Sequence, residues 1–145
     1  MLNILTHEIL IYTDGASREN PGKSASGYLI IEGKKETLET FYNGIKTNNE
    51  AEYIAVIAAL KKLINEDKDS FPIILYSDSE LMIKQLNGKY KVKTLKLIPL
   101  KEEVINLSKK FMSCKFLNVP RENKNISKVD YALNVLLDSI EKSKD

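Results

Sequence analysis

Any catalytic chemistry in this chain must rest on carboxylates. The 145 residues include a single histidine, His7, and a single cysteine, Cys114. One histidine close to the N-terminus argues against histidine-based zinc sites and against Ser-His or Cys-His catalysis. The segment ILIYTDGAS at residues 9–17 ends an apolar run on an acid, Asp14. A carboxylate at the end of a buried strand requires a metal ion, an ion pair or several hydrogen bonds.

Four acids occupy positions that a site at the edge of a sheet would use. Asp14 and Asp78 end predicted strands, whereas Glu52 and Asp130 open predicted helices. If the two strands are parallel neighbours, their acids emerge about 5 Å apart at one edge. Each acid alone has a simpler interpretation, as a turn residue before Gly15, a helix cap or a first-turn anion. Clustered carboxylates repel one another unless cations bind, and Mg²⁺ prefers oxygen ligands, so the four acids together predict a site for two Mg²⁺ ions. Two such ions suit phosphodiester hydrolysis.

The hydrophobic pattern predicts the elements that position these acids. Apolar and β-branched runs predict five strands, and apolar residues spaced by three and four predict helices. The region 16–25 reads as a loop, Asn48 or Asn49 as the cap of the first helix, and Asn43-Gly44 as the end of a strand. The predicted strands are Glu8–Thr13, Gly27–Glu32, Lys35–Tyr42, Ile73–Ser77 and Cys114–Val119, and the predicted helices are Asn48–Glu66, Leu81–Asn87, Pro99–Lys110 and one beginning at Asp130.

The order of these elements, β-β-β-α-β-α-α-β-α, indicates an α/β fold. Three strands in an antiparallel meander are followed by strands reached through helical crossovers, which makes the later strands parallel to the first. We therefore expect a five-stranded mixed sheet flanked by helices. At this length the chain is most simply one domain, residues 1–145.

Composition narrows the setting but does not identify a partner. The longest apolar run is far shorter than a membrane helix, and the N-terminus lacks a signal-peptide pattern, so we expect a cytoplasmic monomer without a membrane partner. The net charge of +2 does not by itself indicate nucleic-acid binding. Lysines do gather without an intervening acid between Lys84 and Lys96, and they form either a phosphate-binding patch or a solvated face.

Several short motifs, in order along most of the chain, resemble those of type 1 ribonuclease H. They are TDGAS, then NPG, then TNNEAEY, YSDSEL and VDYALN, and the resemblance extends from about residue 8 to residue 137. Each motif is weak alone, whereas their order on the expected elements is specific. The resemblance implies a ribonuclease H-like fold and an endonuclease that hydrolyses the RNA strand of RNA–DNA hybrids, leaving 3′-hydroxyl and 5′-phosphate ends.

The resemblance also implies roles for individual residues. Asp14, Glu52, Asp78 and Asp130 match the catalytic, metal-binding acids, with two Mg²⁺ ions or Mn²⁺ as a substitute. In the family the counterpart of Asp14 bridges both ions, those of Glu52 and Asp78 hold the ion beside the leaving group, and that of Asp130 holds the ion that activates water. Residues that match contacts to the backbone and minor groove of the hybrid are Asn20, Thr47, Asn48 and Asn49, and the lysine run adds Lys89, Lys91 and Lys93 as substrate-binding candidates.

The chain departs from the family pattern in three respects. The loop before Asp130 contains no histidine, a position where Arg121, Glu122 or a lysine could substitute. The stretch ENKNISKVD is slightly longer than the usual spacing to the last acid. There is no tryptophan, and hence no Trp-containing basic handle, as in short archaeal and related bacterial members. Two alternatives remain: a non-catalytic hybrid- or duplex-binding module with this fold, and a DNA-directed nuclease of the same superfamily.

Overall fold

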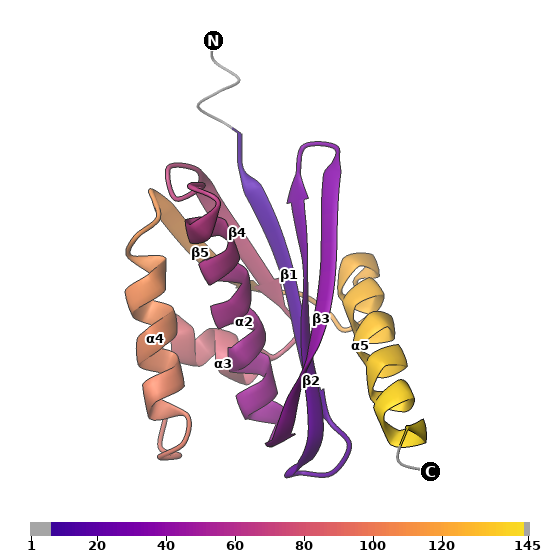
Figure 1. Cartoon of the computed structure of the whole chain (residues 1–145). Coiled ribbons are helices and arrows are strands. Elements are labelled where there is room, and N and C mark those ends of the chain that lie inside the picture. The colour runs from indigo at the N-terminus through magenta and orange to yellow at the C-terminus, as the bar shows by residue number, and fades with distance from the viewer. Residues whose placement is uncertain (1–6, 144–145) are drawn as a thin grey trace.

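The chain folds into a mixed sheet with helices on both faces (Figure 1). The computed structural model describes residues 7–143. The elements follow in the predicted order, and Figure 1 labels them. They are β1 (Ile9–Ser17), β2 (Gly22–Glu32), β3 (Lys35–Lys46), α2 (Asn48–Asn65), β4 (Pro72–Ser77), α3 (Glu80–Leu86), α4 (Ile98–Ser108), β5 (Ser113–Asn118) and α5 (Lys124–Lys142).

The strand order is β3-β2-β1-β4-β5. Strands β1, β2 and β3 form an antiparallel meander, whereas β4 is parallel to both β1 and β5. The expected five-stranded mixed sheet is therefore confirmed. Because β1 and β4 are parallel neighbours, their carboxyl ends lie at the same edge of the sheet.

Two hydrophobic cores lie on opposite faces of the sheet. Helices α2, α3 and α4 cover one face and α5 covers the other (Figure 1). Because side chains alternate along a strand, Ile9 and Ile11 of β1 belong to the core beneath α2, whereas Leu10 and Tyr12 contact the core beneath α5. An even-numbered residue of β1 therefore faces α5.

The spacing of apolar residues by three and four, which predicts this helix, is confirmed as a buried apolar stripe on α2. Tyr53, Val56, Leu60 and Leu63 are all buried against the sheet. Burial of side chains of this size stabilises the fold by roughly 1.5–3 kcal/mol each. This packing fixes the rotation of α2 about its axis, and with it the direction in which Glu52 projects.

The predicted loop from Ala16 to Ala25 is wrong. Strand β1 continues to Ser17 and β2 begins at Gly22, so that Asp14 pairs with Gly27 and Ala16 with Ala25. Residues 15–17 and 24–26 are all Gly, Ala or Ser, and the antiparallel ladder holds them despite their weak strand preference. The turn signal is confined to residues 18–21, and Asp14 lies within β1 and not at its end.

Strand β3 also runs past the predicted stop at Asn43-Gly44. It continues to Lys46, and the register with β2 shifts between Ser24 and Ala25. Gly44 has φ of 79°, a conformation that glycine adopts without a side-chain penalty. Asn43-Gly44 therefore forms a β-bulge and not a turn, so β3 bends here but does not end.

One predicted helix cap and one predicted helix start require correction. Thr47 caps α2, in place of Asn48 or Asn49, and α5 begins at Lys124 behind the cap Asn123, so Asp130 does not open the last helix. Helix α5 starts early because its apolar period begins at residue 126 and continues through 129, 133 and 137, all buried. In the described part of the chain, no helix has both the length and the apolarity needed to cross a bilayer.

Candidate active site

Three carboxylates converge from three elements, as the sequence predicts. Asp14 comes from β1, Asp78 directly follows β4, and Glu52 comes from α2. One carboxylate oxygen of each lies within 4.8 Å of the others. All three line a cleft of about 580 Å³. Such a group has the spacing needed to hold a cation between its members.

The register of the parallel strands brings Asp14 and Asp78 together. Tyr12 of β1 lies opposite Tyr76 of β4, and their rings stack with centroids 4.7 Å apart on the α5 side. Asp14 and Asp78 each follow two residues later and therefore point toward the same face. The pairing of β1 with β4 ends at these tyrosines, which opens the sheet at the level of the two acids.

Gly15 allows α2 to approach β1 closely enough to bring in Glu52. A Cβ atom on Gly15 would lie 2.4 Å from the carbonyl carbon of Ala51 and 2.6 Å from the nitrogen of Glu52. No side chain fits in that space. The contact is reinforced by Ser26, whose hydroxyl donates to the Ala51 carbonyl (2.6 Å) and accepts from the Asn43 amide (2.7 Å). The first turns of α2 are thus fixed to β1, β2 and β3.

Asp78 and Glu52 are not explained as a helix cap and a first-turn acid, because other residues fill these two roles. Ser79 caps α3 by accepting from the Met82 N–H at 3.2 Å, so Asp78 is not that cap. At the start of α2, the Thr47 hydroxyl accepts from the Glu50 N–H (3.1 Å), and the Glu50 carboxylate accepts from the Thr47 N–H (2.9 Å). This capping box makes Glu50 the first-turn acid. Glu52, two residues further on, is left to face the cleft.

Burial and mutual repulsion make the cluster electrostatically strained without cations. Desolvation, followed by the charges of Asp78 and Asp130, raises the pKa of Asp14 from 3.8 to about 8, although the Gly15 N–H donates to its Oδ1 (3.0 Å). The pKa of Glu52 is raised well above its usual value by desolvation and by the charges of Asp14 and Asp78. Desolvation also raises the pKa of Asp78, against the attraction of the Arg121 guanidinium.

The donor set fits divalent metal ions. Oε1 of Glu52 is buried and accepts no hydrogen bond from any group in residues 7–143. An orphaned buried carboxylate oxygen is costly unless a cation or donor is supplied from outside. Carboxylates clustered in a cleft match the all-oxygen coordination preferred by Mg²⁺. The physical strain and the ligand chemistry therefore agree.

Asp130 occupies a different position from the other three acids. It lies in the second turn of α5, is exposed, and lines the same cleft. Its charge and its hydrogen bond to Asp14 are among the causes that raise the pKa of Asp14. It does not belong to the group of three whose oxygens lie within 4.8 Å. Asp130 is therefore placed at the rim, from the α5 side.

Residues of the loop before α5, and a serine in the first turn of this helix, also line the cleft. Arg121 and Glu122, which could replace the absent loop histidine, both line it, and so does Ser127. Sequence reasoning missed Ser127, because the region before Asp130 reads as a polar loop and not as a helical turn. It also read Gly15 as a turn residue. The adjacency of a strand acid to a glycine was the available signal for a close helix contact.

The amide candidates for substrate binding cluster beside the start of α2. The Asn48 N–H donates to Oδ1 of Asn20 (2.9 Å), and Oδ1 of Asn48 accepts from the Ser17 N–H (2.7 Å). The side-chain oxygens of Asn20 and Asn48 therefore each accept a hydrogen bond from a backbone N–H. The NH₂ groups of the two side chains remain as donors. Thr47 is half-buried as the cap, while Asn49 is exposed.

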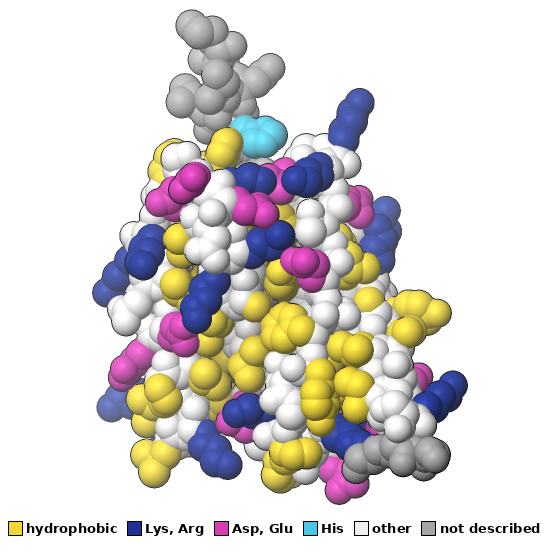
Figure 2. Space-filling model, viewed as in Figure 1, with side chains coloured by type: hydrophobic (Ala, Val, Ile, Leu, Met, Phe, Trp, Pro, Cys, Tyr) yellow, Lys and Arg dark blue, Asp and Glu magenta, His cyan; other side chains and the backbone are white. Residues whose placement is uncertain are grey.

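The three candidate lysines lie outside the cleft. Lys89, Lys91 and Lys93 are exposed in the connection between α3 and α4, which Figure 1 shows at the same end of the molecule as the start of α2. On the face in Figure 2, basic and acidic side chains are interspersed and form no continuous basic field. A contribution from these lysines would therefore be local.

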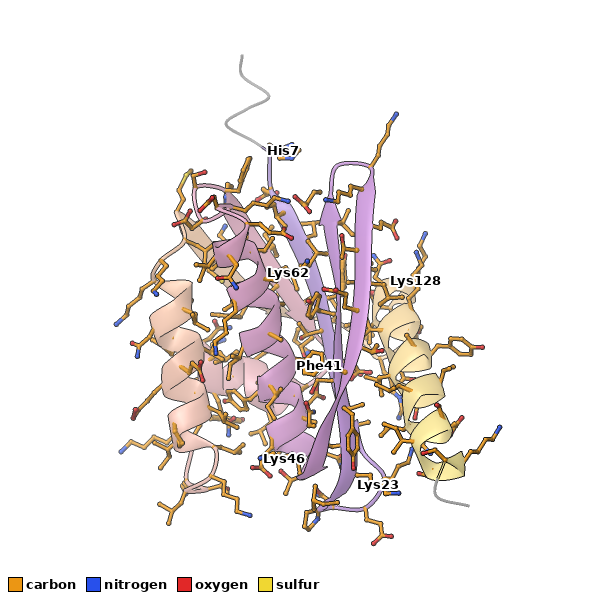
Figure 3. The ribbon with its side chains drawn as sticks, in the orientation of Figure 1. His7, Lys23, Phe41, Lys46, Lys62 and Lys128 are labelled. Carbon is orange, nitrogen blue, oxygen red and sulfur yellow. The ribbon has the colours of Figure 1, made fainter. Side chains whose placement is uncertain are left out.

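His7 and Cys114 take no part in this site. His7 lies beyond the opposite end of β1 (Figure 3), with its ring edge-on to Phe71 at 5.7 Å between centroids. Desolvation raises the pKa of the Cys114 thiol to about 12, so this side chain is protonated at neutral pH.

Comparison with known proteins points to one family. The sequence profile of the family described as RNase H matches residues 6–128 and ends two residues before Asp130. EbsB of Enterococcus faecalis, described as a hydrolase, is 33% identical over 101 residues, which cover 70% of this chain and 74% of EbsB. Matching curated proteins named ribonuclease H or HI are 38% to 43% identical over 40% to 58% of their lengths. The chain thus spans about half the length of these ribonucleases.

Solved structures match over more of the chain. The RNase H1 of the halophilic archaeon Halobacterium salinarum has a TM-score of 0.84 and 33% identity, covering 91% of this chain and 98% of that one. LC11-RNase H1, isolated from compost, was solved in complex with an RNA/DNA hybrid. That structure has a TM-score of 0.77 and 31% identity, covering 89% of this chain and 99% of its own.

Proposed function

Since this chain belongs to the RNase H family, we propose that it is an endonuclease that hydrolyses the RNA strand of RNA–DNA hybrids, leaving 3′-hydroxyl and 5′-phosphate ends. One observation carries the proposal. Three carboxylates from β1, β4 and α2 present oxygens within 4.8 Å of one another in a cleft, and one of these acids has a buried, unpartnered oxygen. Surface acids arranged for solubility would be neither buried nor convergent.

The four acids would hold two Mg²⁺ ions, with Mn²⁺ as a substitute. Bound there, the ions supply Lewis-acid activation of a water and charge stabilisation at the leaving oxygen. Asp14, whose pKa is raised by burial and by the charges of both Asp78 and Asp130, would contact both positions. Glu52 and Asp78 would hold one position, and Asp130 would hold the other from the cleft rim. The burial of Asp14 and of Oε1 of Glu52 keeps competing water away from these ligand oxygens and strengthens their electrostatic effect.

Polar groups beside the cleft would align the hybrid. The NH₂ donors of Asn20 and Asn48, together with Thr47 and Asn49, suit sugar and phosphate oxygens along a minor groove that displays 2′-hydroxyls. The hydrogen bonds that Asn20 and Asn48 accept hold these donors in one arrangement before substrate arrives. LC11-RNase H1, crystallised with an RNA/DNA hybrid, supports this choice of substrate. Lys89, Lys91 and Lys93 would add salt-dependent affinity.

The decisive experiment measures cleavage of a hybrid labelled on its RNA strand, with Mg²⁺ or Mn²⁺, by the wild type and by Asp14→Asn. We expect metal-dependent cleavage that the variant loses. Asp69→Asn, an exposed acid in the turn before β4, is the matched control and should cleave normally. Hybrid binding without cleavage by the wild type would instead indicate a non-catalytic module. Cleavage of double-stranded DNA in preference to the hybrid would indicate a DNA-directed nuclease.

Asp78→Asn separates chemistry from binding. This variant should lose Mg²⁺-dependent cleavage yet bind the hybrid nearly as the wild type does, because Asp78 is proposed to hold a cation and not the sugar or phosphate groups. Binding is measured by fluorescence anisotropy in EDTA. Full activity in Asp78→Asn would overturn the assignment of the site.

A further inference from the structure

Arg18 links the turn between β1 and β2 to the last helix. Its Nη2 donates to the backbone oxygen and to Oδ1 of Asn134, both at 3.1 Å. Its Nη1 contacts Glu141 at 2.9 Å, and Nη2 contacts Asp138 at 2.9 Å. The Arg18 side chain is 29% exposed, whereas Asp138 is 60% exposed and Glu141 is 45% exposed. The guanidinium is therefore held at several points along one face of α5.

Asn134 extends this contact to Asp130. Its Nδ2 donates to the backbone oxygen of Asp130 at 2.9 Å and to the carboxylate Oδ1 of Asp130 at 3.2 Å. The two residues are one turn apart on α5 and so lie on the same side of the helix. A hydrogen-bonded path thus runs from Arg18 through Asn134 to the acid at the cleft rim.

The guanidinium decides which way the Asn134 amide faces. A guanidinium carries donors and no acceptor, so the Asn134 oxygen must face Arg18. The NH₂ group must then face Asp130. In the flipped orientation, the amide oxygen would oppose a carboxylate and the NH₂ group would oppose a cation. Arg18 thereby ensures that Asp130 is met by a donor.

We propose that Arg18 and Asn134 are positioning residues that hold the Asp130 carboxylate in the orientation needed at the cleft. This inference rests on the proposed function, in which Asp130 is a ligand. Asp14 is fixed by burial, and the close contact at Gly15 fixes the backbone that carries Glu52, but Asp130 is exposed. An exposed carboxylate that packing does not hold samples several rotamers, and a hydrogen bond from a fixed amide narrows them.

Four variants test this inference. Asn134→Ala removes the donor and keeps a strong helix former, while Asn134→Gln keeps an amide that can still pair with an acid one turn away. Arg18→Met keeps much of the length of the side chain and removes every donor. Lys128→Met is the matched control, because Lys128 also ties α5 to the sheet, through Glu36 at 3.4 Å, but from the first turns of the helix (Figure 3) and through no bond to Asp130.

The measurements are Mn²⁺ binding to the protein alone by calorimetry, kcat and KM on the hybrid, and Tm in EDTA. Asn134→Ala should weaken Mn²⁺ binding at one site and lower kcat, each by about tenfold, as expected for a residue that orients a metal ligand. KM for the hybrid and Tm should change little. Asn134→Gln should recover most of both losses, Arg18→Met should show a smaller loss, and Lys128→Met should resemble the wild type.

Two results would overturn the inference. One is wild-type Mn²⁺ affinity and kcat in Asn134→Ala; the other is an equal loss in Arg18→Met and Lys128→Met, which would indicate general docking of α5. The binding measurement does not depend on activity. A wild type that binds Mn²⁺ but cleaves no hybrid would refute the proposed function, whereas weaker Mn²⁺ binding in Asn134→Ala would still uphold the positioning role.

Discussion

Replacing Asp14 with Asn should stabilise the metal-free protein while it removes activity. Most substitutions of a buried, hydrogen-bonded side chain reduce stability. Asp14 should behave differently because the metal-free fold must either bury its charge beside other carboxylates or take up a proton to neutralise it. Asn has nearly the same shape and retains an oxygen that can accept the Gly15 N–H. The variant therefore removes the cost of burying or protonating this carboxylate and keeps the local hydrogen bond.

The magnitude follows from the pKa of Asp14, raised from 3.8 to about 8. A carboxyl group whose pKa is higher in the folded state binds more protons there, so stability falls as pH rises between the two pKa values. Each pH unit in this window costs about 1.4 kcal/mol. Between pH 3.8 and pH 7 the wild type loses about 4 kcal/mol that the Asn variant keeps. At pH 5 the corresponding difference is roughly 1–2 kcal/mol.

Thermal unfolding in EDTA provides the assay. A protein of this size gains roughly 3 °C in Tm for each kcal/mol. We expect Asp14→Asn to unfold about 12 °C above the wild type at pH 7 and about 5 °C above it at pH 5. Saturating Mg²⁺ should raise the Tm of the wild type and leave the variant nearly unchanged, because ligands that bind the folded state stabilise it by mass action.

The exposed control Asp69→Asn should show neither the gain nor its dependence on pH. If Asp14→Asn instead lowers Tm in EDTA at both pH values, the Asp14 carboxylate has a favourable partner in the folded protein. The electrostatic account of the cluster would then be wrong. If the gain is present but equal at pH 5 and pH 7, the stabilisation does not come from removal of a buried charge.

Three other perturbations test the parts that hold the site. Gly15→Ala should lower the free energy of unfolding by about 3 kcal/mol and reduce activity, because the new Cβ would meet the Ala51 backbone. Urea unfolding measures the loss of stability, and a variant as stable as the wild type would contradict the close approach of α2. Thr47→Ala should cost about 1 kcal/mol in the same measurement, and no loss would show that the capping box is dispensable. Replacing Lys89, Lys91 and Lys93 with glutamine should weaken hybrid binding. It should also reduce the slope of log affinity against log salt by roughly 0.7 to 0.9 for each lysine that neutralises a phosphate. An unchanged slope would show that these lysines form only a solvated face.

The convergence of Asp14, Asp78 and Glu52 was predictable because it follows from connectivity. Two apolar runs separated by a helix favour parallel neighbouring strands, and parallel neighbours present their carboxyl ends at one edge. The apolar stripe of α2 then fixes the side of the helix that Glu52 occupies. These features depend on periodicity and order, which a sequence displays directly.

The position of Asp130 and the extent of β1 were not predictable in the same way. Strand β1 continues through Gly15, Ala16 and Ser17 because β2 supplies partners for their backbones, and no local preference records that pairing. Helix α5 begins six residues before Asp130, within a stretch that its asparagines and lysines make look like a loop. The apolar period beginning at Ile126 was visible in the sequence, but polar composition outweighed it. Boundaries set by tertiary contacts are therefore the least predictable.

The location of the site follows from the sheet itself. Strand β1 is antiparallel to β2 on one side and parallel to β4 on the other, and the ladder to β4 ends at Tyr12 and Tyr76 while the ladder to β2 continues to Ser17. A carboxylate placed earlier in β1, before Tyr12, would be covered by the apolar side chains of the helices on both faces of the sheet. Just beyond the tyrosines, β4 has ended, and α2 and α5 can each bring an acid to the same opening. A cation bound there would relieve the repulsion that the metal-free fold must tolerate, so cation-dependent stability and catalysis should be lost together when Asp14 is changed.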